Sequence, residues 1–224
     1  MKSQVRGGTR WKRFAVVMVP SVAATAAIGV GLAQGALAAS FSISGQEFKV
    51  KADSLVGKDF VQYGSVDGGK DLEGKPFAEP VAVSGFSEAW ITNMCQSVVT
   101  PKVPFIGDSV TLRLEAGTEE NKPVYAKGIY LDVSELKADA EFGKMDLGIA
   151  AGALNTGPDG KPVAGKPGIQ PNTQANPFGF GQRAEDATLK NVRQKAWATT
   201  AATFKLPNLS LSLHRGTSEE CYKG

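Results

Sequence analysis

Apolar and polar residues alternate along most of the chain beyond residue 40, as in strands with one buried face. The alternation is clearest from Val110 to Leu114 and from Leu209 to Leu213. Phe41 to Asp53 predicts two short strands or one bent strand, with the bend at Gly45 and Gln46. Helical periodicity is weak over the same region. We therefore predict an all-β fold, mostly antiparallel, in the form of a sandwich, a barrel or a short solenoid.

The alternation changes phase once, within the segment from Val124 to Ile149. Ile129, Leu131 and Val133 predict one apolar face, but beyond Glu135 the apolar residues fall on the other set of positions. That second set is Leu136, Ala138, Ala140 and Phe142. Because successive side chains of a strand point to opposite faces, a slip of one residue marks a bulge or a corner. We expect one continuous inner face that crosses a bulge near Glu135.

The sequence KADSLVGK at residues 51–58 returns as KADAEFGK at residues 137–144, with five of the eight letters in common. Neither copy holds a nucleophile paired with a base, so a repeated catalytic element is not indicated. We interpret the repeat as one corner of the β framework that is used twice, with coincidence as the alternative. This interpretation predicts that Ala52 and Ala138 are buried and that Asp53 and Asp139 are more exposed.

Two stretches rich in turn-forming residues interrupt the predicted strands. Asp67 to Pro80 predicts a loop. Residues 155–182 consist largely of Gly, Pro, Asn, Gln and Lys, and are too long for an ordinary connection. We expect a mobile or extended excursion there, either a binding arm or a solvated loop, within a single β-rich domain that covers residues 39–224.

The first 38 residues have the pattern of a secretory signal peptide. Five basic residues and no acidic residue precede Ala39, an apolar run extends from Phe14 to Ala33, and small residues stand at positions 36 and 38. We expect cleavage after Ala38 or Ala39, and the alternative is an uncleaved membrane anchor. The predicted location is therefore outside the cell, either secreted or on the cell surface.

Removal of this leader changes the charge balance. The full chain has 25 Lys and Arg against 22 Asp and Glu, and without the leader 20 basic residues face the same 22 acidic ones. No basic patch then remains to favour nucleic acid as a partner. A lipid, another envelope component or a second copy of the chain are the partners that we consider.

Cys95 and Cys221 are the two cysteines of the chain. An even number of cysteines in a secreted chain favours a disulfide over two free thiols. A zinc site is not indicated, because His214 is the one histidine and both cysteines are assigned to the disulfide. We predict no metal and no cofactor.

Catalytic motifs are incomplete. Gly85 to Ala89 differs in one letter from the G-x-S-x-G elbow that exposes a nucleophilic serine, here Ser87. Ser109 follows Gly107 and Asp108 as in the start of the GDSL esterases, but Leu211 stands where that family places Asp three residues before the histidine. A serine esterase that uses Ser87 or Ser109 as nucleophile and His214 as base is therefore the alternative function. Pairs of carboxylates able to hydrolyse glycosides are also left open.

Several stretches resemble a secreted actinobacterial family of uncharacterised function whose members are often labelled cholesterol esterase. The resemblance rests on the leader RWKRFAVVMVPSVAATAAIGVGLAQGALAASF, on FSISGQEFKVKADSLVG, on GIYLDVSELKADAEFGKMDLG, and on TFKLPNLSLSL with a late cysteine. It implies a Gram-positive protein that is secreted or associated with the envelope, and it brings no catalytic residues. Together with the incomplete motifs, it favours a non-enzymatic β-rich protein that binds a lipid or other apolar ligand, or that assembles on the cell surface.

Overall fold

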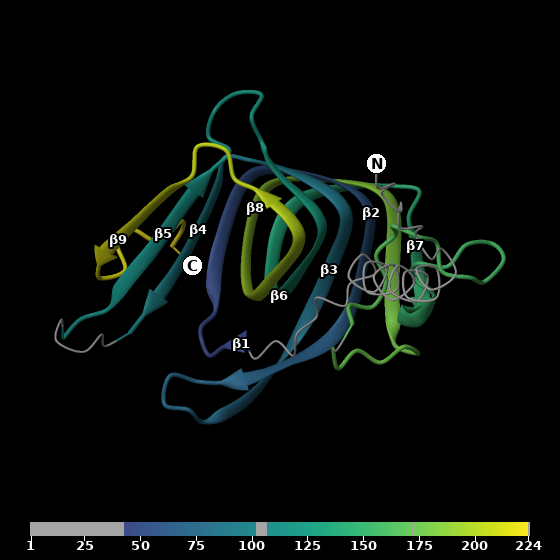
Figure 1. The fold of residues 1–224 in the computed structure, drawn as a ribbon, viewed down its shortest axis with the longest axis horizontal. Helices are drawn as coiled ribbons and strands as arrows, with labels where there is room; N and C mark the ends of the chain where they lie inside the picture. The colour runs from purple at the N-terminus through teal and green to yellow at the C-terminus, as the bar shows by residue number, and fades with distance from the viewer. Residues whose placement is uncertain (1–42, 102–106, 172, 224) are drawn as a thin grey trace, which may run out of the picture. The chain divides into compact units, whose positions relative to one another are not determined.

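The computed structural model describes residues 43–101, 107–171 and 173–223. The predicted signal peptide lies outside the described residues. Nine strands and one short 3-10 helix (Ala151–Ala153) make up the regular structure of the described part, which is all-β as predicted (Figure 1). None of the helical structure described is long and apolar enough to span a membrane.

Four long strands form a closed sheet, which we call the ring. They are β2 (Phe48–Lys70), β3 (Pro76–Thr92), β6 (Val124–Gly143) and β8 (Phe180–Lys205). β2 pairs with β3, β3 with β6 and β6 with β8, all antiparallel. β8 then pairs with the first half of β2, which closes the sheet. Of the three predicted arrangements, this pairing corresponds to the barrel.

The ring is closed with a large stagger between its strands. Val56 of β2 pairs directly with Thr188 of β8. In the other direction round the ring, Val56 pairs with Trp90 of β3, Trp90 with Tyr125 of β6, and Tyr125 with Lys205 of β8. Lys205 is the last residue of β8 and lies far along that strand from Thr188. A large stagger requires strands that are strongly tilted and coiled. The four strands accordingly curve around a common interior (Figure 1).

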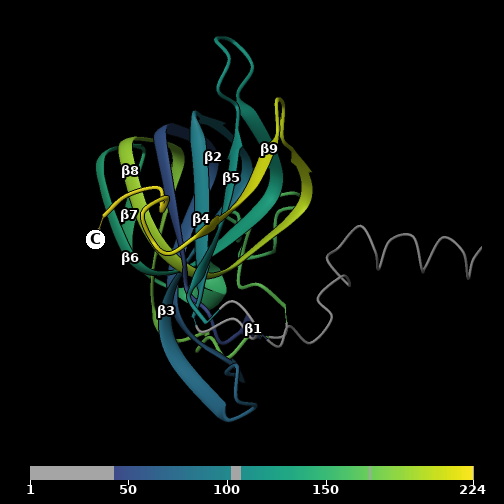
Figure 2. The same cartoon turned by 90° about the vertical axis from the view of Figure 1, so that its left-hand side faces the viewer.

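Three shorter strands extend the sheet to one side of the ring, and we call them the wing (Figures 1 and 2). They are β4 (Met94–Thr100), β5 (Val110–Ala116) and β9 (Ser210–Arg215), in the order β2-β4-β5-β9. The predicted disulfide between Cys95 and Cys221 is present and holds the C-terminal tail against β4, with 5.8 Å between the two Cα atoms. β1 (Ile43–Ser44) pairs in parallel with β2, and β7 (Asp146–Ala150) pairs with β8.

The predicted loop from Asp67 to Pro80 is wrong in most of its length. β2 and β3 remain paired as far as Lys70 and Pro76, so only residues 71–75 form a turn. Within that turn, the Asp71 carboxylate accepts hydrogen bonds from the backbone N–H groups of Glu73 and Lys75. Local turn chemistry therefore closes the hairpin tightly, and the Gly-rich residues before it continue the strand.

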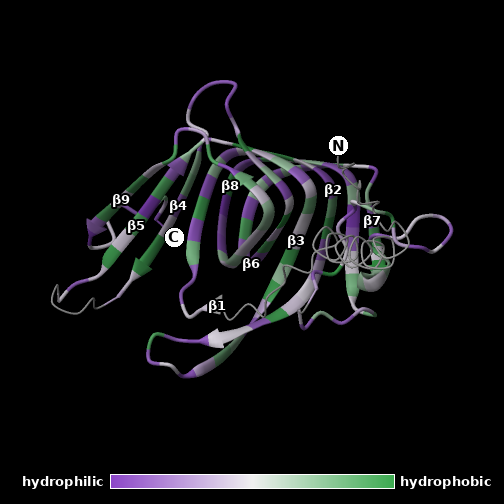
Figure 3. Ribbon diagram, in the orientation of Figure 1, coloured by the Kyte–Doolittle hydropathy of each residue, from purple (hydrophilic) through white to green (hydrophobic). Residues whose placement is uncertain are grey.

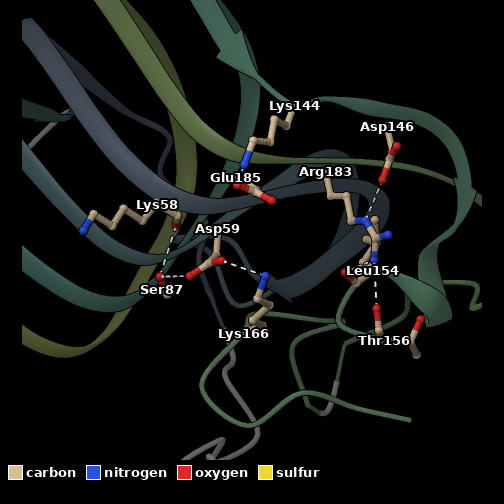
Figure 4. Close-up of polar contacts among 10 residues, drawn as sticks. All are labelled: Lys58, Asp59, Ser87, Lys144, Asp146, Leu154, Thr156, Lys166, Arg183 and Glu185. Atoms are coloured by element: carbon tan, nitrogen blue, oxygen red, sulfur yellow. Dashed lines mark hydrogen bonds and ion pairs between the residues drawn. The ribbon is translucent and has the colours of Figure 1, made fainter. Parts of the chain in front are cut away.

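The Gly/Pro-rich excursion does not extend as a free arm. Residues 155–171 and 173–179, which we call the cover segment, contact the outer face of the ring through Ile169 and Ala175, and residues 180–182 already belong to β8. Ile169 and Ala175 contact a cluster of Val61, Tyr63, Val81 and Val83, and the backbone N–H of Gln170 donates to the Tyr63 hydroxyl over 2.8 Å. Arg183 holds the start of the segment, since its guanidinium donates to the carbonyls of Leu154 and Thr156 (Figure 4).

The interior of the ring carries the main hydrophobic core. Alternating apolar and polar residues mark the long strands (Figure 3), and the inward-facing apolar residues meet inside. The predicted slip is confirmed, because the β6–β8 register shifts on both sides of Val133. Leu131 and Val133 before the shift, and Leu136 and Ala138 after it, all face the same interior cavity. A bulge thus keeps one apolar face continuous along a strongly bent strand.

The KAD repeat flanks one stretch of β8. Residues 51–58 and 137–143 pair with opposite edges of β8 between Asp186 and Arg193. In each copy the aspartate accepts a hydrogen bond from an asparagine with positive φ, Asp53 from Asn93 and Asp139 from Asn191. Ala52 is buried, Ala138 is half-buried, and both aspartates are exposed. These contacts support a structural corner used twice, with looser packing around the second copy.

The glycines of the two copies differ in what a methyl group would meet. A Cβ on Gly57 would overlap the buried Phe86 ring, whereas the nearest atom to a Cβ on Gly143 is 3.6 Å away. We predict that Gly57→Ala lowers the free energy of unfolding by about 1–3 kcal/mol, since Phe86 must shift within a packed core. The matched variant Gly143→Ala should change it by less than about 0.5 kcal/mol. Urea denaturation followed by fluorescence measures both, and equal effects would contradict the packing assigned to Gly57.

Candidate functional site

The interior of the ring contains a cavity of about 270 Å³. Residues from β2, β3, β6 and β8 all contribute to its wall. The apolar lining residues are Leu55, Phe60, Phe86, Leu131, Val133, Leu136, Ala138, Ala140, Phe142, Leu189 and Val192. The polar ones are Gln62, Ser84, Gln182 and Gln194. A concave, mostly apolar site with a few polar groups is the usual form of a small-molecule site.

The strand pairing explains where this cavity reaches the surface. β3 pairs with β6 only as far as Val133, and beyond it β6 pairs only with β8 among the described strands. The wall is therefore interrupted along the second half of β6. Leu136 and Ala140 lie there with exposed side chains although both line the cavity. This gap forms an apolar entrance.

Three phenylalanines pack together between the entrance and the core. The Phe60 ring lies 5.3 Å from the Phe86 ring and 5.0 Å from the Phe142 ring, centre to centre. Phe60 and Phe86 are buried, whereas Phe142 is half-buried at the entrance. Tilted aromatic pairs at such distances contribute beyond the area that they bury. They give the cavity one firm apolar wall.

A chain of hydrogen bonds links three of the polar lining residues. Gln182 donates from Nε2 to Oε1 of Gln62 over 2.5 Å, and Gln62 donates from Nε2 to Oγ of Ser84 over 2.9 Å. These groups satisfy one another in an apolar surrounding, where an unpaired amide would be costly. The chain therefore joins β8, β2 and β3 at this side of the cavity.

Gln194 differs from these three residues. Its side chain is only 5% exposed and makes no hydrogen bond with another described residue. It lines the cavity and also a smaller one of about 30 Å³, which shares Leu55, Leu131 and Val192 with the first. The Gln194 amide thus lies where the two cavities meet.

The sequence contains a signal for these buried polar residues. Gln194 lies in phase with Val192 and Ala196, and Gln62 lies in phase with Phe60. A polar residue on the inner phase of a strand indicates a group that is buried for a reason. On β8 this signal is weak, because the sequence from Arg183 to Ala196 fits neither the helical nor the strand period well.

Ser87 lies on the outer face of β3, away from the lining of the cavity. Its hydroxyl donates to the Asp59 carboxylate over 2.7 Å, and Asp59 in turn forms an ion pair with Lys166 over 3.2 Å (Figure 4). In serine hydrolases the partner of the nucleophile is an imidazole that takes its proton. The contacts of Ser87 instead fasten the cover segment to the ring.

Ser109 lies next to the wing, just before β5, and His214 lies within the wing, on β9. The backbone N–H of Ser109 donates to the Asp108 carboxylate, a local turn before β5. His214 of β9 is opposite Thr111, and its Nε2 lies 2.8 Å from Oγ of Ser212. Neither residue lines the cavity. The described hydrogen bonds do not join either predicted nucleophile to His214.

A buried pair of carboxyl groups lies outside the cavity. Asp67 of β2 and Asp132 of β6 are hydrogen-bonded to each other, and both are more than nine-tenths buried. Burial, together with the charge of Asp67, raises the pKa of Asp132 to about 7, and burial also raises the pKa of Asp67. Two adjacent buried carboxyls favour a state in which they share one proton. Retaining glycosidases need about 5 Å between their carboxyls, a separation that a direct hydrogen bond does not leave.

Residues 44–222 match the model of a family of unknown function, DUF6230. The chain belongs to this family. No curated protein and no solved structure matches the chain. The matched region includes the ring, the wing and the cover segment. Because the function of the family is unknown, the candidate site is argued from the geometry of the cavity.

The carboxyl pair makes the stability of the protein depend on pH. The pKa of Asp132 is higher in the folded chain than in the unfolded chain, so the folded state holds a proton that the unfolded state releases above about pH 4. Stability from this pair is thus complete at low pH, falls as pH rises to about 7, and then stays level. We predict that Asp132→Asn is more stable than the wild type by a few kcal/mol at pH 8, at about 1.4 kcal/mol per pKa unit.

The measurement is chemical denaturation of both proteins between pH 4 and pH 9. The difference between them should be smallest at pH 4 and reach a plateau above pH 7. Asp186→Asn, at an exposed site on β8, is the control and should follow the wild type. A difference for Asp132→Asn that does not vary with pH would contradict the shared proton.

Proposed function

We propose that this protein is a non-enzymatic binding protein that takes a lipid or another apolar ligand into the cavity of the ring. The observation that carries the proposal is the cavity itself, with its apolar wall, its entrance along β6 and its few polar groups. A protein that only needed a stable sheet would fill this space with side chains, because each void in a core lowers stability. The hydrogen bonds of Ser87 and Ser109 with carboxylates do not favour the esterase alternative.

The size of the cavity limits the ligand. A volume of about 270 Å³ lies just below the usual range for small-molecule sites. At roughly 30 Å³ for a water-sized group, it holds about ten non-hydrogen atoms. A medium-length chain, or part of a longer one that leaves through the entrance, matches this volume.

We further propose that the protein acts outside the cell, secreted or on a Gram-positive envelope. The start of the sequence supports export, and the Cys95–Cys221 disulfide suits an oxidising compartment. We propose an actinobacterial origin because the leader and three later stretches resemble that family. Apolar molecules outside the cell need a carrier through water, which is a role that this cavity suits.

A second candidate function, self-assembly, rests on the wing. β9 pairs with β5 on one side only among the described strands, and Leu209, Leu211 and Leu213 are 52%, 62% and 70% exposed. His214 on the same strand is half-buried, whereas the leucines face outward. The C-terminal tail is the cause, because its Gly216 and Cys221 bind Thr111 and Ser97 on the other face. A free strand edge with exposed leucines favours pairing with another chain.

The binding proposal is tested by closing the entrance. Ala140 lines the cavity with an exposed side chain, so Ala140→Trp can place an indole in the entrance with little disturbance of the core. N-phenyl-1-naphthylamine, an apolar fluorescent probe, is larger than the cavity, and we expect it to bind the wild type with one ring system inside and the rest in the entrance. It should bind this variant at least tenfold more weakly. Glu141→Trp, one residue along and facing outward, is the control and should bind like the wild type. Equal binding by all three proteins would place the probe elsewhere.

The assembly candidate is tested by sedimentation of the protein over a range of concentrations. Wild-type protein should self-associate, and the double variant Leu211→Asp with Leu213→Asp should sediment as a monomer, because charges on the edge oppose pairing. Thr217→Asp with Ser218→Asp, which adds two charges to the exposed tail beyond β9 and leaves the leucines in place, is the control and should self-associate like the wild type. A wild type that is monomeric at every concentration would rule out assembly through the wing.

A further inference from the structure

We propose that the ligand carries an uncharged polar group, a hydroxyl or a carbonyl, and that this group enters the cavity and binds the amide of Gln194. The inference rests on the proposed binding function and specifies the chemical class of the ligand. It excludes a carboxylate or an ammonium head group inside the ring. It follows from the position of Gln194 and from the absence of charge in the described lining.

Gln194 occupies an interior position that its neighbours give to apolar side chains. On β8 it is opposite Leu136 of β6 and Val50 of β2, and both of those side chains face inward. The residue is 95% buried, no hydrogen bond joins its side chain to another described residue, and it lines both cavities. Its amide therefore opens onto the cavities with unused donor and acceptor capacity. A ligand group that accepts from and donates to this amide uses that capacity without breaking a hydrogen bond between described residues.

The other polar residues that line the larger cavity do not offer the same opportunity. Gln62, Ser84 and Gln182 already bind one another, so a ligand there competes with existing hydrogen bonds. A ligand that binds Gln194 replaces no hydrogen bond between described residues. The polar end of the ligand is therefore expected at the junction of the two cavities, and its apolar end toward Phe60 and Phe142.

The lining also decides the charge of the ligand. Every residue that lines either cavity is uncharged, and none of them is titratable near neutral pH. A charged group that leaves water for such a surrounding pays a large desolvation cost, which only a paired opposite charge can offset. A hydroxyl or carbonyl needs only one or two hydrogen bonds, which the Gln194 amide supplies.

The experiment compares ligands of one chain length that differ only in the head group. 1-Decanol, decanoate and decylammonium each displace N-phenyl-1-naphthylamine from the full chain at pH 7.5, below their aggregation limits. We expect 1-decanol to bind at least tenfold more tightly than either ion. Decanoate or decylammonium binding as tightly as 1-decanol would overturn the inference, because the head group would then remain in water, while the binding function would stand. No binding of the probe or of any of the three would overturn the proposed function as well.

A variant separates the role of Gln194 from that of the cavity. Gln194→Leu keeps the volume of the side chain and removes its hydrogen bonds, so 1-decanol should bind about three- to tenfold more weakly, as expected for one lost hydrogen bond. The apolar probe should bind this variant at least as tightly as the wild type, which also shows that the variant is folded. Gln96→Leu, which lines only the smaller cavity, is the matched control and should leave 1-decanol binding unchanged. An unchanged affinity of Gln194→Leu for 1-decanol would overturn the role assigned to its amide.

Discussion

The pairing of β8 with β2 is the interaction on which the rest of the structure depends. β8 uses both of its edges, one against β6 and the other against β2, and thereby turns a row of strands into a closed surface with an inside. The large stagger of this closure forces the strands to coil, so that only four long strands enclose a space. Without it, the same residues would form an open twisted sheet with no cavity.

Closure also creates two separate apolar regions, one inside the ring and one on its outer face. The inner one is incompletely filled and reaches the surface along β6, whereas the outer one is sealed by the cover segment. On this outer side the cover segment binds the Tyr63 hydroxyl, and Asp67 and Asp132 are hydrogen-bonded to each other. In the proposed function, the packing on the outer face stabilises the strands, and the inner face takes the ligand.

Much of this framework was predictable from local patterns, because alternation with period two and its slip at Glu135 follow from single-strand geometry. The disulfide was predictable because the chain has only two cysteines. The long hairpin and the cover segment were not predictable, because their Gly and Pro residues indicate turns. In the hairpin, pairing between β2 and β3, such as Asp67 with Glu79, extends the strands instead. In the cover segment, contact with Tyr63 decides the structure. The cavity was also beyond prediction, because it depends on which strands meet across the ring. Gln194 was visible only as a polar residue in an ambiguous run, and its meaning depends on closure by β2.

The order of the strands along the chain has a consequence for how the molecule forms. β8 is the last long strand, and it must find β2, which is made more than a hundred residues earlier. The cysteine that fastens the tail comes later still, at position 221. Contacts between such distant parts of a chain form slowly, and they require nearly the whole polypeptide to be available. A growing or partly translocated chain therefore has no interior to occupy. If the chain is exported as its start suggests, the cavity comes into existence only after passage is complete, and its first occupant must be met on the far side of the membrane.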